Sequence, residues 1–260
     1  MEYSIRDWHN RYQQQSHWTH NLRQYLYTQI DIGSVNHILD VGCGTGVLEA
    51  ELTQKTKAGI VGIDIDLSAL NMAAHSSPST RFILADGHHL PHQADAFDLV
   101  ICHFLLLWVQ EPLQILREMF RVIRTGGAVL AIAEPDYGGR VDFPIELESL
   151  GICQIKSLQA QGANPKIGRQ LPSLFIQAGF SEVESGVLGG QWSADSLHEN
   201  HEAEWNMLEY DLYQLGEQSV KSSELRDLEI LNRKAYQSGE RVLFVPTFYA
   251  WGRKMAKLIQ

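Results

Sequence analysis

The stretch ILDVGCGTG at residues 38–46 decides the fold. Its first half is an apolar run of the kind found in strands buried on both faces of a parallel sheet. Three glycines at alternate positions then let the backbone turn tightly and approach a ligand closely. The helical pattern of Val47–Thr53 follows at once, so free N–H groups and the positive dipole end of a helix would face that ligand. The stretch therefore predicts a strand, a loop and a helix that together suit a carboxylate or a phosphate.

Short apolar runs alternate with helical patterns from residue 37 to about residue 133. The runs that we predict to be strands are His37–Val41, Gly59–Asp64, Arg81–Ala85, Phe97–Cys102 and Ala128–Ala133. Helices that connect parallel strands make right-handed crossovers and cover both faces of the sheet. We therefore predict a doubly wound, Rossmann-like α/β fold with a mostly parallel seven-stranded sheet and an antiparallel edge strand.

The regular alternation stops after residue 140, although helical patterns continue. We expect a single domain over residues 1–260, with helical additions to its sheet. Its parts are a helical cap at 1–30, a cofactor-binding core at 35–135, a helical substrate lid at 140–178 and 192–240, and edge strands at 180–190 and 242–252. Pro246 lies in the last range, and because proline is tolerated in edge strands and bulges, we place that strand at the sheet edge.

The charge balance bears on which partners the protein accepts. Its 260 residues include 21 Lys and Arg and 31 Asp and Glu, a formal net charge of −10. Affinity for nucleic acid or for anionic membranes needs surplus positive charge, so we expect neither partner. Three widely spaced cysteines form no disulfide or zinc pattern, which is typical of a reducing compartment. Because no signal-peptide core or bilayer-length apolar run is visible, we expect a soluble, cytoplasmic protein.

The spacing of the glycines separates two kinds of ligand. A dinucleotide loop reads Gly-x-Gly-x-x-Gly, whereas this loop reads Gly-x-Gly-x-Gly and follows Asp40. An acidic residue there would repel a pyrophosphate and welcome an ammonium group. Asp64, at the end of the second strand, can accept both hydroxyls of a ribose, and Asp86 can accept a hydrogen bond from an adenine amino group. Amino acid, ribose and adenine together describe S-adenosylmethionine.

Four motifs at these spacings resemble those of a known family. They are ILDVGCGTG (38–46), GIDID (62–66), ADGHHLP (85–91) and FDLVICHFLLLW (97–108). Together they look like the successive motifs of the class I S-adenosylmethionine-dependent methyltransferases. They most resemble methyltransferase type 11, the small-molecule branch that includes the ubiquinone and menaquinone biosynthesis enzymes. The resemblance covers about residues 37–133 and is broken at 124–127 (RTGG), where the family usually has a proline before the glycines.

The resemblance implies a cofactor site for S-adenosylmethionine, with S-adenosylhomocysteine as the product. Its candidates in the glycine loop are Asp40, Gly42, Cys43, Gly44 and Gly46, and the three glycines would line the methionine portion. Asp64 would hold the ribose, and Ile65 would pack on the adenine. Asp86 and the backbone of Gly87 would read the adenine.

Residues on both sides of the core are expected to complete the crevice. Tyr12, Gln15 and Trp18 in the first helix are candidates for a cap over the cofactor, with aromatic faces near the sulfonium. Packing of that helix against the sheet is the alternative for them. Asp136 and Tyr137 follow the fifth strand and are candidates for contacts with the substrate, with capping and packing as the alternative.

Histidines near the predicted crevice have several interpretations. His103 follows the fourth strand, where ligands bind in open α/β sheets, so it is a candidate for lining the cofactor pocket and for acting as a general base. A structural histidine is the alternative. His88, His89 and His92 lie in a polar loop after Asp86, and no carboxylate or cysteine completes a ligand set at a suitable spacing, so we expect no metal site.

The predicted activity is methyl transfer from S-adenosylmethionine to a nucleophile on a small molecule, with O-, N-, S- and C-methylation all open. Holding nucleophile, methyl and sulfur in line supplies roughly 7–11 kcal/mol of barrier reduction, against roughly 3–5 kcal/mol from a general base. One alternative is methylation of a protein or an RNA. For nucleic acid, the acidic charge and the absence of an Asn/Asp-Pro-Pro-Tyr/Phe motif after the fourth strand count against it. The second alternative is that the protein is a non-catalytic scaffold that binds the cofactor.

Overall fold

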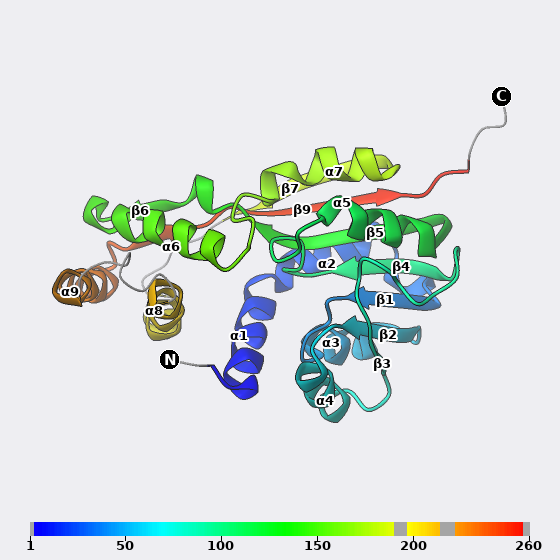
Figure 1. The fold of residues 1–260 in the computed structure, drawn as a ribbon, viewed down its shortest axis with the longest axis horizontal. Coiled ribbons are helices and arrows are strands. Elements are labelled where there is room, and N and C mark those ends of the chain that lie inside the picture. Colours follow the sequence, from blue (N-terminus) through cyan, green and yellow to red (C-terminus); the bar gives the residue numbers. More distant parts are fainter. Residues whose placement is uncertain (1–2, 190–196, 214–221, 257–260) are drawn as a thin grey trace.

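The central feature is a seven-stranded sheet in the order β3-β2-β1-β4-β5-β9-β7 (Figure 1). The computed structural model describes residues 3–189, 197–213 and 222–256. The strands of this sheet are β1 (His37–Val41), β2 (Gly59–Asp64), β3 (Arg81–Leu84), β4 (Phe97–Cys102), β5 (Ile123–Pro135), β7 (Ser181–Leu188) and β9 (Thr247–Arg253). The first five run parallel, and β9 runs antiparallel to both β5 and β7. The mostly parallel seven-stranded sheet predicted from the sequence is confirmed.

Helices cover both faces of the sheet. On one face, α2 (His20–Gln29) and α3 (Val47–Lys55) share an apolar cluster with the β1, β4 and β5 side chains. On the other face, α5 (Pro112–Val122) and α7 (Leu171–Ala178) share a second cluster with the same strands. The connection α4 (Leu67–Ser76) packs against β2 and β3. The central strands β1, β4 and β5 are therefore buried from both sides, which accounts for their continuous apolar runs in the sequence.

Two consecutive helices occupy most of the described N-terminal segment, α1 (Ile5–Trp18) and α2. Ser4 and Asp7 form a capping box that starts α1, and Thr19 ends it. Whereas α2 lies on the sheet, α1 stands between the sheet and a separate group of helices (Figure 1). The predicted cap is thus carried by α1.

The separate group of helices consists of α6 (Glu148–Ala160), α8 (Leu197–Tyr213) and α9 (Ser222–Ser238). Its apolar core contains Leu147, Leu150, Trp205, Leu208 and Leu212. Parts of the expected lid at 192–196 and 214–221, Leu215 among them, lie outside the described residues. The range 140–178 needs a correction, because its last helix, α7, packs against α5, β7 and β9 and belongs to the sheet layer.

The expected edge strand at 242–252 also needs a correction. It is divided into β8 (Val242–Phe244) and β9, and Pro246 lies between them. β8 pairs with β6 (Val141–Phe143) in a small second sheet, whereas β9 lies between β5 and β7, so that β7 is the edge. Proline donates no hydrogen bond to a ladder, and here it occupies the break, where its carbonyl accepts the Asp136 N–H at 2.7 Å.

Short 3₁₀ turns complete the described chain: η1 (Ile32–Ser34), η2 (Tyr137–Gly139), η3 (Ile145–Leu147) and η4 (Gly168–Gln170). Within the described ranges, no helix combines the length and the apolar character needed to cross a bilayer.

Candidate active site

A cavity of about 370 Å³ opens where the strand order reverses, between β1 and β4. In open α/β sheets, ligands bind at this switch point, beyond the carboxyl ends of the strands. The walls come from the glycine loop, α1, the loop after β4, η2, α6 and α8. Nine of the predicted site residues line it: Tyr12, Gln15, Asp40, Gly42, Cys43, Gly44, Asp64, His103 and Tyr137.

The glycine loop has the backbone that its sequence predicts. Gly42, Gly44 and Gly46 all have positive φ, at 76°, 53° and 77°, where a side chain would be strained. The Gly44 N–H donates to the Asp64 carboxylate at 2.8 Å, which joins the loop to the end of β2. A Cβ on Gly44 would lie 3.1 Å from a ring carbon of Tyr12, so α1 closes directly over the loop.

Three predicted cofactor contacts are not among the residues that line the cavity. Ile65 is 75% exposed although it is apolar. Asp86 is exposed and accepts hydrogen bonds from the backbone N–H and the ring of His88, which lowers the pKa of its carboxyl. Gly87 packs against Val41 and Ile115, where a Cβ would come within 3.0 Å of both. The predicted adenine end therefore lies outside the cavity, and the predicted methionine end lines it.

Three other candidates also lie outside the cavity. Gly46 begins α3, and a Cβ there would meet Ala73 of α4 at 2.9 Å, so it serves the packing of two helices. Trp18 lies under the Arg11 guanidinium at 4.7 Å from the ring centroid. Asp136 is buried, pairs with Arg169 and caps η2. For Trp18 and Asp136 the structure places the side chains in packing and capping positions.

An acidic pair lies beneath the glycine loop, and only half of it was found from the sequence. Asp40 lines the cavity, and Glu49 of α3 faces it from the buried side. No N–H or hydroxyl group of the described residues donates to Asp40 Oδ1 or to either Glu49 oxygen. Burial raises the pKa of Asp40 to about 7, and burial together with the Asp40 charge raises the pKa of Glu49 well above its usual value. A cationic group entering the cavity would satisfy this pair.

The position of Gly62 in the structure indicates where the Glu49 carboxyl lies, which the sequence alone does not show. A Cβ on Gly62 would come within 2.8 Å of Glu49 Oε1 and within 2.9 Å of Cys43 Sγ. The first residue of the GIDID motif therefore leaves room for the carboxyl of α3. No spacing rule connects these residues, because they meet only when β2 and α3 pack together.

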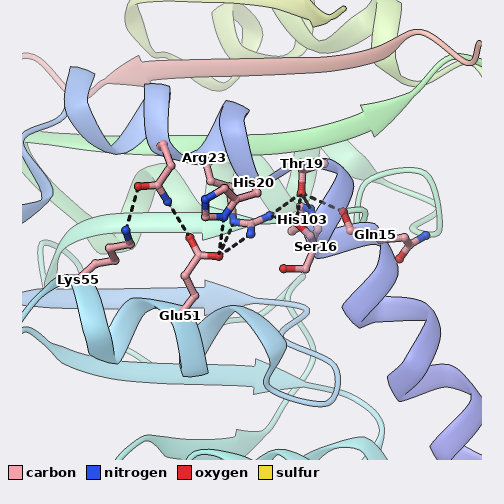
Figure 2. A network of polar contacts seen from close by, with 9 residues as sticks. Gln15, Ser16, Thr19, His20, Arg23, Glu51, Lys55 and His103 are labelled. Atoms are coloured by element: carbon pink, nitrogen blue, oxygen red, sulfur yellow. Dashed lines mark hydrogen bonds and ion pairs between the residues drawn. The ribbon is translucent and has the colours of Figure 1, made fainter. Parts of the chain in front are cut away.

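His103 belongs to a polar network that joins the cavity to α1 and α2 (Figure 2). Its Nε2 lies 2.9 Å from Thr19 Oγ1, which also accepts from Arg23 Nη1 at 2.5 Å. Arg23 in turn pairs with Glu51. The Thr19 hydroxyl donates its one proton to the Gln15 carbonyl at 3.0 Å, so it can only accept from His103. The imidazole proton is therefore on Nε2, and Nδ1 is an acceptor. Burial and the Arg23 charge lower the pKa of His103 to about 3, so the ring is neutral.

Glu134 is a second buried carboxylate that sequence reasoning missed. It accepts hydrogen bonds from the N–H groups of Leu105, Leu106 and Leu107 at 3.0, 2.8 and 3.1 Å. Burial raises the pKa of Glu134 to about 8, and the three N–H groups act in the opposite direction. The carboxylate thereby holds the loop after β4, which forms one wall of the cavity.

The far wall of the cavity comes from residues that sequence reasoning did not select. Trp8 and Arg11 extend the stripe of Tyr12 and Gln15 along α1, at helical spacings of three and four. On α8 the stripe consists of Met207, Tyr210 and Asp211, at the same spacing. The apolar periodicity of α8 marks a neighbouring face of the helix, with Trp205 and Leu208, and this face packs inside the helical group. The sequence signal that could have indicated the cavity wall is the run of polar side chains, such as Tyr210 and Asp211, beside the apolar face of α8.

Comparisons with known proteins agree with this geometry. A family model described as a methyltransferase domain matches residues 39–131. The demethylmenaquinone methyltransferase of Lactiplantibacillus plantarum is 30% identical over 189 residues, which cover 64% of this chain and 78% of that protein. The chain belongs to the class I S-adenosylmethionine-dependent methyltransferases.

Two further proteins are similar, one in sequence and one in fold. The methyltransferase GfsG of Streptomyces halstedii is 32% identical over 145 residues, which cover 54% of this chain. That match spans about half of GfsG, 52% of its length. The phosphoethanolamine N-methyltransferase 2 of Haemonchus contortus, solved with S-adenosyl-L-methionine, has a TM-score of 0.55 at 15% identity and covers 85% of this chain and 49% of that one. The last likeness concerns the fold.

The residues of this methyltransferase chain fit its family's cofactor. Asp40 lines the cavity and its Oδ1 is a buried acidic oxygen without an N–H donor among the described residues, which suits an ammonium group. The Asp64 carboxylate lines the same cavity next to the loop. Exposed Ile65 offers an apolar surface outside it, of the kind on which a flat base can lie.

Proposed function

We propose that this protein transfers the methyl group of S-adenosylmethionine to a nucleophile on a small molecule. One observation carries the proposal: a cavity runs from the glycine loop to α8 of the helical group. Its volume of about 370 Å³ is in the range of small-molecule sites. The walls, which include Leu105, Leu107, Leu158 and Met207, are largely apolar. A folded protein or an RNA helix would not enter such a space.

The assignment of cofactor contacts is part of the same proposal. The loop from Gly42 to Gly46, with Cys43 between its glycines, holds the methionine portion, and Asp40 receives its ammonium group. Asp64 receives the ribose hydroxyls, since its carboxylate already lines the cavity. Ile65, Asp86 and Gly87 receive the adenine on the open surface beside β3.

Catalysis in this proposal rests mainly on positioning. When bound, S-adenosylmethionine supplies a methyl group on a sulfonium that is already a strong leaving group. The chain's own part is to hold the acceptor in line and to exclude water, and Tyr12, Gln15 and Tyr137 surround the space where this happens. A pKa of about 3 makes His103 a weak proton acceptor. We therefore propose that His103 contributes chiefly by tying α1 to the cavity.

The names of the relatives do not select one class of acceptor, since one of them includes a carrier protein. The name of the Lactiplantibacillus plantarum relative describes a demethylmenaquinone methyltransferase, and another relative is a malonyl-[acyl-carrier protein] O-methyltransferase from Salmonella typhimurium. These acceptors differ in size and in reacting atom. The class of acceptor therefore follows from the cavity and not from the names.

The test is transfer of radioactive methyl groups from S-adenosylmethionine into fractionated cell extract. We expect label in the small-molecule fraction, and none above background with Gly44→Ala, whose added Cβ would meet Tyr12. Label in the protein or RNA fraction would favour methylation of a macromolecule. Cofactor binding by calorimetry, without transfer to any fraction, would favour the scaffold.

A further inference from the structure

Arg11 differs from the other buried arginines in the described part of the chain. Arg23 pairs with Glu51, and both Arg140 and Arg241 pair with Asp142. For Arg11 no carboxylate lies within ion-pair distance among the described residues. Its Nη1 donates to Gln14 Oε1 at 2.7 Å, and its Nε is buried without any hydrogen-bond partner.

A guanidinium removed from water without an anion is costly, because its hydrogen bond to Gln14 and its contact with the Trp18 ring do not replace all the interactions it loses. The effect is visible in the pKa of Arg11, which burial lowers. Since Arg11 lines the cavity, a ligand in that cavity can supply the missing acceptor. A carboxylate is the natural partner, because its two oxygens match the fork of the guanidinium.

The Arg11 side chain points away from the glycine loop. The groups whose charge acts on Arg11 include Tyr137 of η2 and Asp211 of α8. The groups that act on Tyr12, the next residue, are Asp64 and Asp66 at the end of β2. Neighbouring residues on a helix point about 100° apart. Arg11 therefore faces the helical group, and Tyr12 faces the glycine loop.

The nearest acidic group on that side has its own partner. Asp211 Oδ2 accepts from Gln154 Nε2 at 2.7 Å. Two aromatic rings line the same cavity as Arg11: Trp8 and Tyr210 pack edge to face, with their ring centroids 5.8 Å apart. Flat, apolar groups pack well against such rings.

We propose that Arg11 binds a carboxylate of the methyl acceptor, whose flat apolar body lies against Trp8 and Tyr210. This inference rests on the proposed function for its acceptor, and it deepens that proposal by naming the chemical class: an aromatic carboxylic acid. Arg11 is then a specificity-determining residue, and the acidic group determines which end of the acceptor faces the cofactor.

The experiment measures binding of matched acids and amides to the protein saturated with S-adenosylhomocysteine. The probes are benzoate, phenylacetate and indole-3-acetate, each paired with its amide. We expect at least one acid to bind about tenfold or more tightly than its amide, as expected for a hydrogen bond to a charged group. Arg11→Gln should abolish this preference, Arg11→Lys should keep part of it, and Arg233→Gln on the exposed face of α9 should leave it unchanged.

Several results would overturn the inference. Equal affinity for acids and amides, no binding of any acid, or an acid preference that survives in Arg11→Gln each would do so. Tighter binding of phenyl phosphate than of every carboxylate would overturn the assignment to a carboxylate. A tenfold loss of S-adenosylmethionine affinity in Arg11→Gln, with acid binding intact, would assign Arg11 to the cofactor's own carboxylate instead.

The design keeps this failure distinct from failure of the proposed function. Cofactor affinity and methyl transfer are measured separately from acid binding, and acid binding is repeated without S-adenosylhomocysteine. An acid preference that survives in a folded Arg11→Gln protein that still binds the cofactor would count against Arg11 alone. Absence of cofactor binding in the wild type would count against the function alone.

Discussion

The Nε2 atom of His103 lies 2.9 Å from the hydroxyl oxygen of Thr19. The first residue follows β4 and the second ends α1, so this single contact joins the sheet to the helix that closes the cavity. The Arg23 guanidinium donates to the same hydroxyl. The position of α1 over the glycine loop depends on this buried polar junction.

Removing the Thr19 hydroxyl should therefore destabilise the protein. Thr19→Val keeps the shape of the side chain but removes the partner of His103 Nε2 and one of the acceptors of the Arg23 guanidinium. We expect a loss of about 1–3 kcal/mol in the free energy of unfolding, measured with urea. Thr28→Val is the matched control, because that exposed hydroxyl donates only to a carbonyl of its own helix. Equal losses in the two variants would contradict the role of the junction.

His103 should make the cofactor-free protein sensitive to acid. Its pKa is lowered from 6.5 to about 3, so between these values the unfolded chain binds a proton that the folded protein does not. The free energy of unfolding should then fall as pH decreases, by up to about 1.4 kcal/mol for each pH unit. His103→Gln should flatten this slope between pH 6 and pH 4, and unfolding curves at these values measure it. An unchanged slope would show that other groups cause the acid sensitivity.

The acidic pair beneath the loop should act in the opposite direction. The pKa of Asp40 is raised from 3.8 to about 7, so its neutral form contributes stability below pH 4 that is lost as pH rises toward 7 and above. Asp40→Asn should therefore lose less thermal stability than the wild type between pH 5 and pH 8. Melting temperatures at the two pH values check this.

The same substitution should weaken cofactor binding, because an amide does not pair with an ammonium group as a carboxylate does. We expect S-adenosylmethionine affinity to fall by about tenfold or more in calorimetry. The exposed Asp31→Asn is the control for charge alone. Undiminished affinity in Asp40→Asn would remove Asp40 from the methionine site.

Glu134 should control the order of the loop that follows β4. Glu134→Gln offers one oxygen where the carboxylate accepts three N–H groups. We expect faster hydrogen exchange at the amides of Leu105 and Leu107, and a loss of about 1–3 kcal/mol in stability. Glu182→Gln, on the exposed edge strand, should change neither quantity. Exchange that stays slow at both amides would show that packing alone orders the loop.

Local pattern was sufficient for much of the fold. The predicted strands agree closely with β1 to β4 and with the centre of β5, because strands buried on both faces need continuous apolar runs. Gly179 ends α7 with φ of 104°, as a glycine at a helix C-terminus predicts. The prediction was wrong for Pro246, since a proline excludes a central ladder position but does not say which neighbouring segment enters the sheet.

The residues at the cofactor end of the site could also be predicted from a short stretch of sequence, whereas those at the acceptor end could not. Gly42, Gly44 and Asp64 meet in one loop and the adjacent strand end, so a short motif predicts them. Glu49 and Arg11 have no such motif. Glu49 is recognised only because it faces the buried carboxyl of Asp40. Arg11 is recognised only because it shares a cavity with α8, a helix almost two hundred residues away in the sequence.

The sequence by itself determined the sheet, the glycine loop and the family, because these depend on backbone geometry and on apolar periodicity within short segments. Only the tertiary structure decided the order of β9 and β7, the pairing of Asp40 with Glu49, and the burial of Arg11 Nε without a hydrogen-bond partner among the described residues. These features depend on which distant groups meet after packing, and burial and charge act on a side chain only once its neighbours are in place.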